Sequence, residues 1–130
     1  MTVGLLAAAL ANPAHACDVR LDGAFASLKS ERFQAAARTD PRRVVPAVPF
    51  AVEIVVCAAG AQGLPESVAV DAHMPAHRHG MNYRTVTTAT APGRYRSEGF
   101  FFHMPGIWEF AIELRAGDKT DRLTATIVVE

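Results

Sequence analysis

The stretch PFAVEIVVC, residues 49–57, decides the fold class of this chain. It is a nearly continuous apolar run rich in β-branched residues, as expected of a strand that is buried in a β-sandwich. From Phe33 onward, apolar and polar residues alternate with a period of two, whereas no segment sustains helical periodicity. The pattern therefore predicts an all-β protein.

Further segments with strand patterns lie on both sides of this stretch. They cover residues 33–38, 67–72, 83–90, 94–103, 107–115 and 123–129, and turn sequences such as APG, MPG and AGDKTD separate several of them. Strands with turn signals at intervals of about eight to twelve residues predict an immunoglobulin-like β-sandwich of about seven strands and Greek-key type. In the N-terminal segment 17–30 we expect a short helical turn, because Phe25 and Leu28 are three residues apart.

The first residues are expected to form a secretory signal peptide. The apolar run VGLLAAALA (3–11) is too short to span a bilayer, and NPAHA (12–16) supplies a helix breaker and the small-x-small pattern of a cleavage site. Cleavage after Ala16 would leave one domain, 17–130, with an N-terminal extension and first strand at 17–48 and a core at 49–130. We therefore expect export, with no membrane insertion of the mature chain.

The charge balance argues against nucleic acid as a partner. The chain has 13 Lys and Arg residues and 13 Asp and Glu residues, so its formal net charge is zero. A neutral chain has no long-range field that would attract nucleic acid or an anionic membrane.

The two cysteines, Cys17 and Cys57, predict one disulfide, because an even number in an exported chain is most simply a bridge. A bridge across 57 − 17 = 40 positions would stabilise the domain by about 4 kcal/mol in the chain-entropy model. The alternative is a lipoprotein acylated on Cys17. The preceding AHA sequence, however, lacks the Leu that normally lies three positions before such a cysteine.

Histidine and methionine are concentrated in two windows, HMPAHRHGMNY (73–83) and FFHMPGIW (101–108). Outside the leader, they hold every histidine and methionine of the chain: His73, Met74, His77, His79, Met81, His103 and Met104. Proline cannot donate a ladder hydrogen bond, so Pro75 and Pro105 are expected where strands end. We therefore expect the two windows to meet at one end of the sandwich.

Imidazole and thioether ligands together indicate a soft metal site. Thioether sulfur selects copper(I), whereas calcium and magnesium prefer oxygen ligands and structural zinc prefers Cys or several His and carboxylates. In an extended segment His77, His79 and Met81 would point the same way, which makes them the more credible ligands. Each His-Met-Pro triplet should offer one member to the site and one elsewhere, with His73 as the lesser candidate.

Structural alternatives apply to the same residues. Met74 and Met104, each beside a proline at a strand end, are individually typical of core packing, and a single histidine on a turn is usually solvated. Trp108 is expected to be a core residue that walls the site and keeps it dry. Asp71 is expected to accept a hydrogen bond at a strand end or to orient an imidazole from behind the metal ligands.

The sequence VDAHMPAHRHGMNY, followed by PGRYRSEGFFFHMPGIWEFAIEL, resembles the YtkA-like family of exported bacterial β-sandwich domains. The resemblance covers roughly residues 48–130, and its specific part is 71–110. One departure from the family pattern is Pro105, which stands between Met104 and Gly106. The resemblance implies an immunoglobulin-like fold, a periplasmic or cell-envelope location and a link to copper.

Two functions follow as hypotheses. The first is a periplasmic copper(I) carrier or metallochaperone, with ligands drawn from the two windows and an envelope copper enzyme or transporter as partner. The second is a non-metal accessory module of an envelope complex, in which residues 73–83 present His, Arg78 and Tyr83 to a partner. A hydrolytic enzyme is not expected, because no Ser or Cys has a nucleophile motif around it and Asp71 with His73 is a weak acid–base pair.

Overall fold

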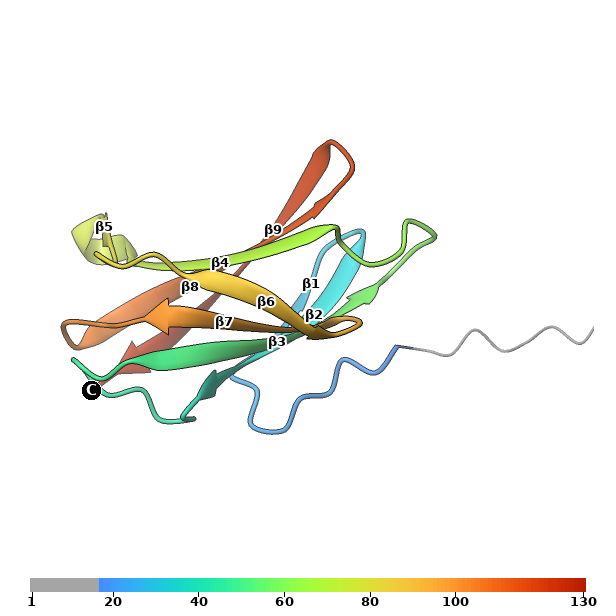
Figure 1. Ribbon diagram of the computed structural model, residues 1–130. Coiled ribbons are helices and arrows are strands. Elements are labelled where there is room, and N and C mark those ends of the chain that lie inside the picture. The colour runs from blue at the N-terminus through green and yellow to red at the C-terminus, as the bar shows by residue number, and fades with distance from the viewer. Residues whose placement is uncertain (1–16) are drawn as a thin grey trace, which may run out of the picture.

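The computed structural model describes residues 17–130, and the expected signal peptide, 1–16, lies outside the described residues. Two antiparallel sheets pack face to face (Figure 1). The strands are β1 (Ala26–Lys29), β2 (Phe33–Asp40), β3 (Phe50–Ala58), β4 (Ser67–Met74), β5 (His79–Gly80), β6 (Val86–Ala91), β7 (Arg94–Phe100), β8 (Gly106–Ala116) and β9 (Lys119–Val129). A single turn of 3-10 helix, η1 (Pro75–His77), lies between β4 and β5.

The strand order is that of an immunoglobulin constant-type domain. One sheet has the order β1-β2-β3-β7-β6 and the other β5-β4-β8-β9. If β2, β3, β4, β6, β7, β8 and β9 are lettered A to G, the sheets become ABED and CFG, with β1 and β5 as short additions at two edges. The predicted immunoglobulin-like sandwich is therefore confirmed.

The core follows the alternation seen in the sequence. On β8, Trp108, Phe110, Ile112 and Leu114 are all 0% exposed, whereas Glu109 and Glu113 face outward. The run at 49–57 supplies β3, most of which is buried. Trp108 is thus a core residue, as expected from its parity with the other apolar residues of this strand.

Three local predictions are wrong. The segment 17–30 forms no helical turn but strand β1, because its backbone pairs antiparallel with β2 and its apolar side chains pack against the core. Residues 77–81, interpreted as an extended segment, contain the end of η1 and only the two-residue strand β5. The strand predicted at 94–103 ends at Phe100, because the following residues leave the sheet and the carbonyl of Phe102 accepts a hydrogen bond from Ala47.

The predicted disulfide between Cys17 and Cys57 is present, with a Cα–Cα distance of 5.6 Å. It ties the N-terminal extension to the end of β3. Close to it, Arg32 forms an ion pair with Asp121 of β9 and donates to the carbonyls of Ala116 and Lys119. This end of the sandwich is called the far end below. Within residues 17–130, no helix has the length and apolar character needed to cross a membrane.

Candidate metal site at the rim of the sandwich

The two His/Met windows meet at one end of the sandwich, called the rim below. The imidazole rings of His79 and His103 have centroids 5.1 Å apart, and those of His77 and His79 are 5.8 Å apart. These three residues form the imidazole cluster. The chain brings them together because β4 pairs antiparallel with β8, so that the segment after β4 lies beside the segment before β8.

The second window reaches the rim by a different route from the one predicted. Pro75 directly follows β4, as expected, but Pro105 directly precedes β8 instead of closing β7, which ends at Phe100. Residues 101–105 therefore form a loop between two strands of opposite sheets. Proline suits the position before a strand as well as the position after it, because neither requires a ladder donor.

Trp108 forms the floor beneath the imidazole cluster. It is fully buried, its ring stacks on Phe102 at a centroid distance of 4.0 Å, and its indole Nε1 donates to the carbonyl of Met104 at 3.1 Å. The rings of His79 and His103 lie at steep angles to the indole, with centroids 6.2 and 5.7 Å away. The indole hydrogen bond fixes the backbone of the second window, so Trp108 positions the cluster as well as filling the core.

Met74 packs in the core, which was the alternative to its role as a metal ligand. Its side chain is 1% exposed. The methyl group lies over Gly106, where a Cβ atom would be only 2.5 Å from Met74 Cε, and Gly106 has a φ of +135°. The positive φ favours glycine there, and a larger residue would also displace the Met74 methyl group. This contact holds the start of the first window against the start of β8.

The remaining methionines lie on different sides of the structure. Met104 is half-buried beside the core in the loop that carries His103, whereas Met81 packs against the core and lines a hollow on the outer side of β4. The expectation that His77, His79 and Met81 share one direction assumed an extended backbone. The backbone is not extended, because η1 and the left-handed Arg78 (φ 50°) turn the chain between His77 and His79. The rings of His77 and His79 still lie together, with centroids 5.8 Å apart, whereas Met81 lines the outer hollow.

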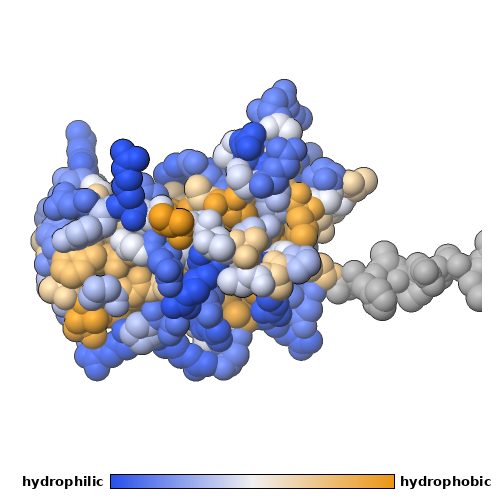
Figure 2. Space-filling model, viewed as in Figure 1, coloured by the Kyte–Doolittle hydropathy of each residue, from blue (hydrophilic) through white to orange (hydrophobic). Residues whose placement is uncertain are grey.

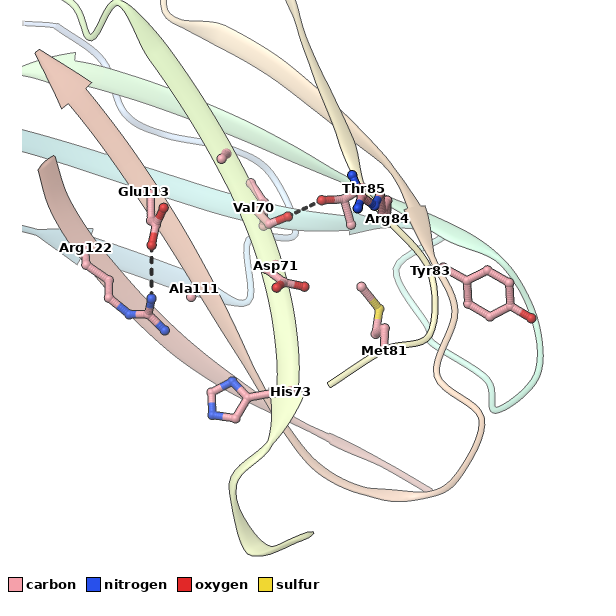
Figure 3. Close-up of a pocket in the computed structure, with 11 residues that line it drawn as sticks. Val70, Asp71, His73, Met81, Tyr83, Arg84, Thr85, Ala111, Glu113 and Arg122 are labelled. Atoms are coloured by element: carbon pink, nitrogen blue, oxygen red, sulfur yellow. Dashed lines mark hydrogen bonds and ion pairs between the residues drawn. The ribbon is translucent and has the colours of Figure 1, made fainter. Parts of the chain in front are cut away.

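His73 and Asp71 face away from the imidazole cluster. Both line a hollow of about 550 Å³ on the outer face of the β4–β8 sheet (Figure 3). His73 Nε2 lies 3.7 Å from the carboxylate of Glu109, and the Asp71 carboxylate accepts a hydrogen bond from the backbone N–H of Ala72. Asp71 was expected either to accept a hydrogen bond at a strand end or to orient an imidazole. It accepts a hydrogen bond, but it lies within β4 and not at the end of the strand. The carboxylate that lies beside the His73 imidazole is that of Glu109. The pairing of β4 with β8 places it there, and the spacing in the sequence does not indicate it.

Within residues 17–130, the imidazoles at the rim form no ion pair and few hydrogen bonds. His77 and His103 are exposed and His79 is half-buried, and the only imidazole hydrogen bond in the described part of the chain joins His79 Nδ1 to its neighbour's carbonyl, at 3.3 Å. Across residues 17–130, no three His, Cys, Asp or Glu side chains are arranged to hold a metal ion. A metal at the rim would therefore require thioether sulfur in addition to nitrogen, or a small rearrangement of the exposed rings.

The comparisons with known proteins bear on the fold alone. No protein-family model matches the chain, and no curated protein matches it in sequence. A crystal structure of a DUF4426 family protein from Pseudomonas aeruginosa PAO1 is similar, with a TM-score of 0.54 at 10% sequence identity. The similarity covers 85% of this chain and 99% of that one. At this identity the likeness shows the fold alone.

Proposed function

We propose that the protein binds copper(I) at the rim and acts as an exported copper carrier or metallochaperone. The observation that supports the proposal most directly is the approach of the His79 and His103 rings to 5.1 Å from opposite windows. His77 is the third imidazole of the cluster, and Met104, next to His103 in the loop, is the candidate thioether ligand. Met74, Met81 and His73 drop to lesser candidates because of their positions. Binding and transfer would be the whole activity.

The donor chemistry favours a soft ion that exchanges. Imidazole nitrogen and thioether sulfur are neutral ligands, and thioether sulfur favours copper(I) over hard cations. The buried indole and its stacked partner Phe102 present a dry, apolar floor to one side of the rings. On the other side the rings are open to solvent, so a partner's ligands could replace them one at a time. An open site of weak ligands suits a carrier better than a store.

The proposed location and relationship are consistent with this chemistry. Disulfides persist in oxidising compartments, so the Cys17–Cys57 bridge supports export to the periplasm or cell envelope. The leader sequence supports the same location. We further propose kinship with the YtkA-like family, on the sequence of residues 71–110, and an envelope copper enzyme or transporter as the partner that receives the ion.

A competition titration with a chromogenic copper(I) chelator tests the proposal. We expect about one copper(I) per chain with a Kd below about 1 µM. His79→Ala and His103→Ala should each weaken binding by about tenfold or more, because each removes a ligand from a different window. Loss of affinity in only one of the two variants would show that the windows do not share one ion.

Two matched controls separate ligand loss from damage to the fold. His73→Ala removes an imidazole from the outer face, where it lies beside Glu109, and should leave the copper affinity unchanged. Met74→Leu keeps the volume of a core side chain but removes its sulfur, and should also leave the affinity unchanged. Copper uptake no greater than that of a variant lacking His73, His77, His79 and His103 would refute the carrier proposal.

A second candidate, a non-metal interaction module, is favoured by the exposed side chains around the rim. Tyr83 is 55% exposed and rests edge-on against Phe101, and Val48 is also exposed. Figure 2 shows hydrophobic surface at this end of the molecule amid a hydrophilic surround. Exposed aromatic side chains on a rigid support are typical of binding sites for other proteins. Tyr83→Ala would then abolish partner binding, whereas the copper titration would show no uptake.

A further inference from the structure

The four edges of the two sheets differ in how they are protected. Exposed edge strands invite pairing with another chain, and proteins usually blunt them by shortness, bulges, charge or cover. At three edges such a device is present: β1 has 4 residues, β5 has 2, and β6 has a register irregularity between Ala89 and Ala91. Beyond β5, the edge of β4 receives a hydrogen bond from Thr85 to the carbonyl of Val70. At the β9 edge such devices are confined to the first residues, where Lys119, Asp121 and Arg122 are charged and Arg32 caps the carbonyl of Lys119; residues 123–129 have no charge and no register shift.

Strand β9 is long and regular, and in its first part Ser30 and Arg32, which follow β1, bind Asp121. Its 11 residues pair with β8 from Lys119 to Val129 without a shift of register. The last seven, LTATIVV, contain no charge, proline or glycine and are mostly β-branched. In the described part of the chain, residues 120–129 make no backbone hydrogen bond outside the β8–β9 ladder, and Arg32 caps only the carbonyl of Lys119. The outer edge of β9 therefore offers a row of free backbone donors and acceptors.

We propose that this edge pairs antiparallel with β9 of a second copy of the chain. The sequence Leu-Thr-Ala-Thr-Ile, 123–127, has nearly the same pattern in both directions. A two-fold axis at Ala125 would set Thr124 opposite the partner's Thr126 on the outer face. On the inner face it would set Leu123 opposite the partner's Ile127. A two-fold interface must be self-complementary, and Thr–Thr and aliphatic cross-strand pairs are favourable ones.

Exposed apolar side chains next to the β9 edge also favour pairing with a second copy of the chain. Val128 is 72% exposed, and its cross-strand neighbour on β8, Ile107, is 55% exposed. A hollow of about 440 Å³ lies against the same strand and includes Phe25, Val44 and Ile127 in its lining. Joining two copies would merge two four-stranded sheets into one and would cover part of this surface. In each copy the imidazole cluster rests on Trp108 of β8, so β9 lies between it and the strand of the partner.

Sedimentation velocity on the purified chain, from about 1 µM to 1 mM, tests the pairing. The wild-type chain should shift with concentration from the mass of one copy to the mass of two. A Thr124→Lys/Thr126→Lys variant would place Lys opposite Lys across the axis and should keep the mass of one copy throughout. A Thr124→Glu/Thr126→Glu variant should do the same. An equimolar mixture of the two variants should recover the mass of two copies, because the facing charges become opposite.

The chain contains its own matched control. Strand β6 carries the same Thr-Ala-Thr triplet at residues 88–90, again at a sheet edge with both threonines exposed. Thr88→Lys/Thr90→Lys should dimerise like the wild type. A single-copy mass for the wild type at every concentration would overturn the proposal. So would a doubled mass that survives either β9 variant, or a doubled mass that only the β6 variant abolishes.

Discussion

At the far end of the sandwich, the chain is held by a disulfide and by an ion pair between Arg32 and Asp121, whereas at the rim it is held by aromatic stacking and by Met74 packed over Gly106. The far end has side chains that bind one another. The rim has imidazoles that rest against a hydrophobic floor and are otherwise open. The covalent and ionic links are thus at the far end, where no ligand is expected, whereas the rim is held by apolar packing.

This difference explains how a small domain could keep exchangeable ligands exposed. A side chain that stabilises the fold through a strong ion pair must break that pair before it can bind a metal, and the free energy of the pair is subtracted from the affinity. His79 and His103 have no carboxylate partner among the described residues, whereas His73, on the outer face, lies beside one. The rim imidazoles are therefore available without such a loss.

Trp108→Ala should have the largest effect on stability, because it removes the floor of the rim. We expect the free energy of unfolding to fall by about 3–5 kcal/mol in urea denaturation, as for other large-to-small changes at fully buried aromatic residues. Copper affinity should fall as well, since the indole no longer holds the Met104 carbonyl and the two windows can separate.

Trp108→Phe is the control for this prediction. It keeps an aromatic ring against Phe102 but deletes the indole donor, so most of the stability should remain while copper affinity still falls. An unchanged affinity in Trp108→Phe would mean that the hydrogen bond to Met104 does not position the ligands.

Removal of the disulfide should affect only the far end. In a Cys17→Ala/Cys57→Ala variant we expect a loss of about 2–4 kcal/mol in the free energy of unfolding, because the reduced chain is less restricted when unfolded. Copper affinity, measured by the same competition titration, should stay within about twofold of the wild type at temperatures where the variant is folded. A parallel loss of affinity would show that the two ends are coupled, contrary to the comparison drawn above.

The sequence predicted the sandwich well because burial in a sheet follows a period of two. The alternation on β8 identified its buried residues, Trp108, Phe110, Ile112 and Leu114. The disulfide was predicted because the chain has only two cysteines. The meeting of the two windows was also predicted, although only Pro75 follows a strand as the prediction assumed and Pro105 precedes one. These features depend on properties of single segments.

The site was less predictable because it depends on backbone conformations that few residues encode. Parity arguments stop at the first non-extended residue, and the left-handed Arg78 could not be foreseen at a position where glycine or asparagine is the usual signal. The cross-strand neighbour of His73 was equally hidden, because Glu109 is far away in sequence and is brought opposite by the β4–β8 register. Contacts between segments require the register, which a single sequence does not contain.

The smallest predicted effect concerns the ion pair of the far end and its dependence on pH. Arg32 and then Ser30, by hydrogen bonding to the carboxylate, hold the pKa of Asp121 below its ordinary value, so the folded protein favours the charged form. A lowered folded-state pKa stabilises the protein fully above the unfolded pKa, near 4, and this contribution is lost as the pH falls through the folded value. Asp121→Asn should therefore cost about 1 kcal/mol at pH 7, since the pair is mostly but not wholly buried.

That cost should shrink as the pH falls below 4, whereas between pH 5 and 7 it should stay constant, which urea denaturation at several pH values would measure. Asp118→Asn is the matched control, because Asp118 lies in the neighbouring turn, is exposed and has no ion pair within the described residues. A cost for Asp121→Asn that is the same at pH 3 and pH 7 would assign the effect to the hydrogen-bond geometry instead of the charge. The far end would then be held, like the rim, by contacts that do not depend on pH.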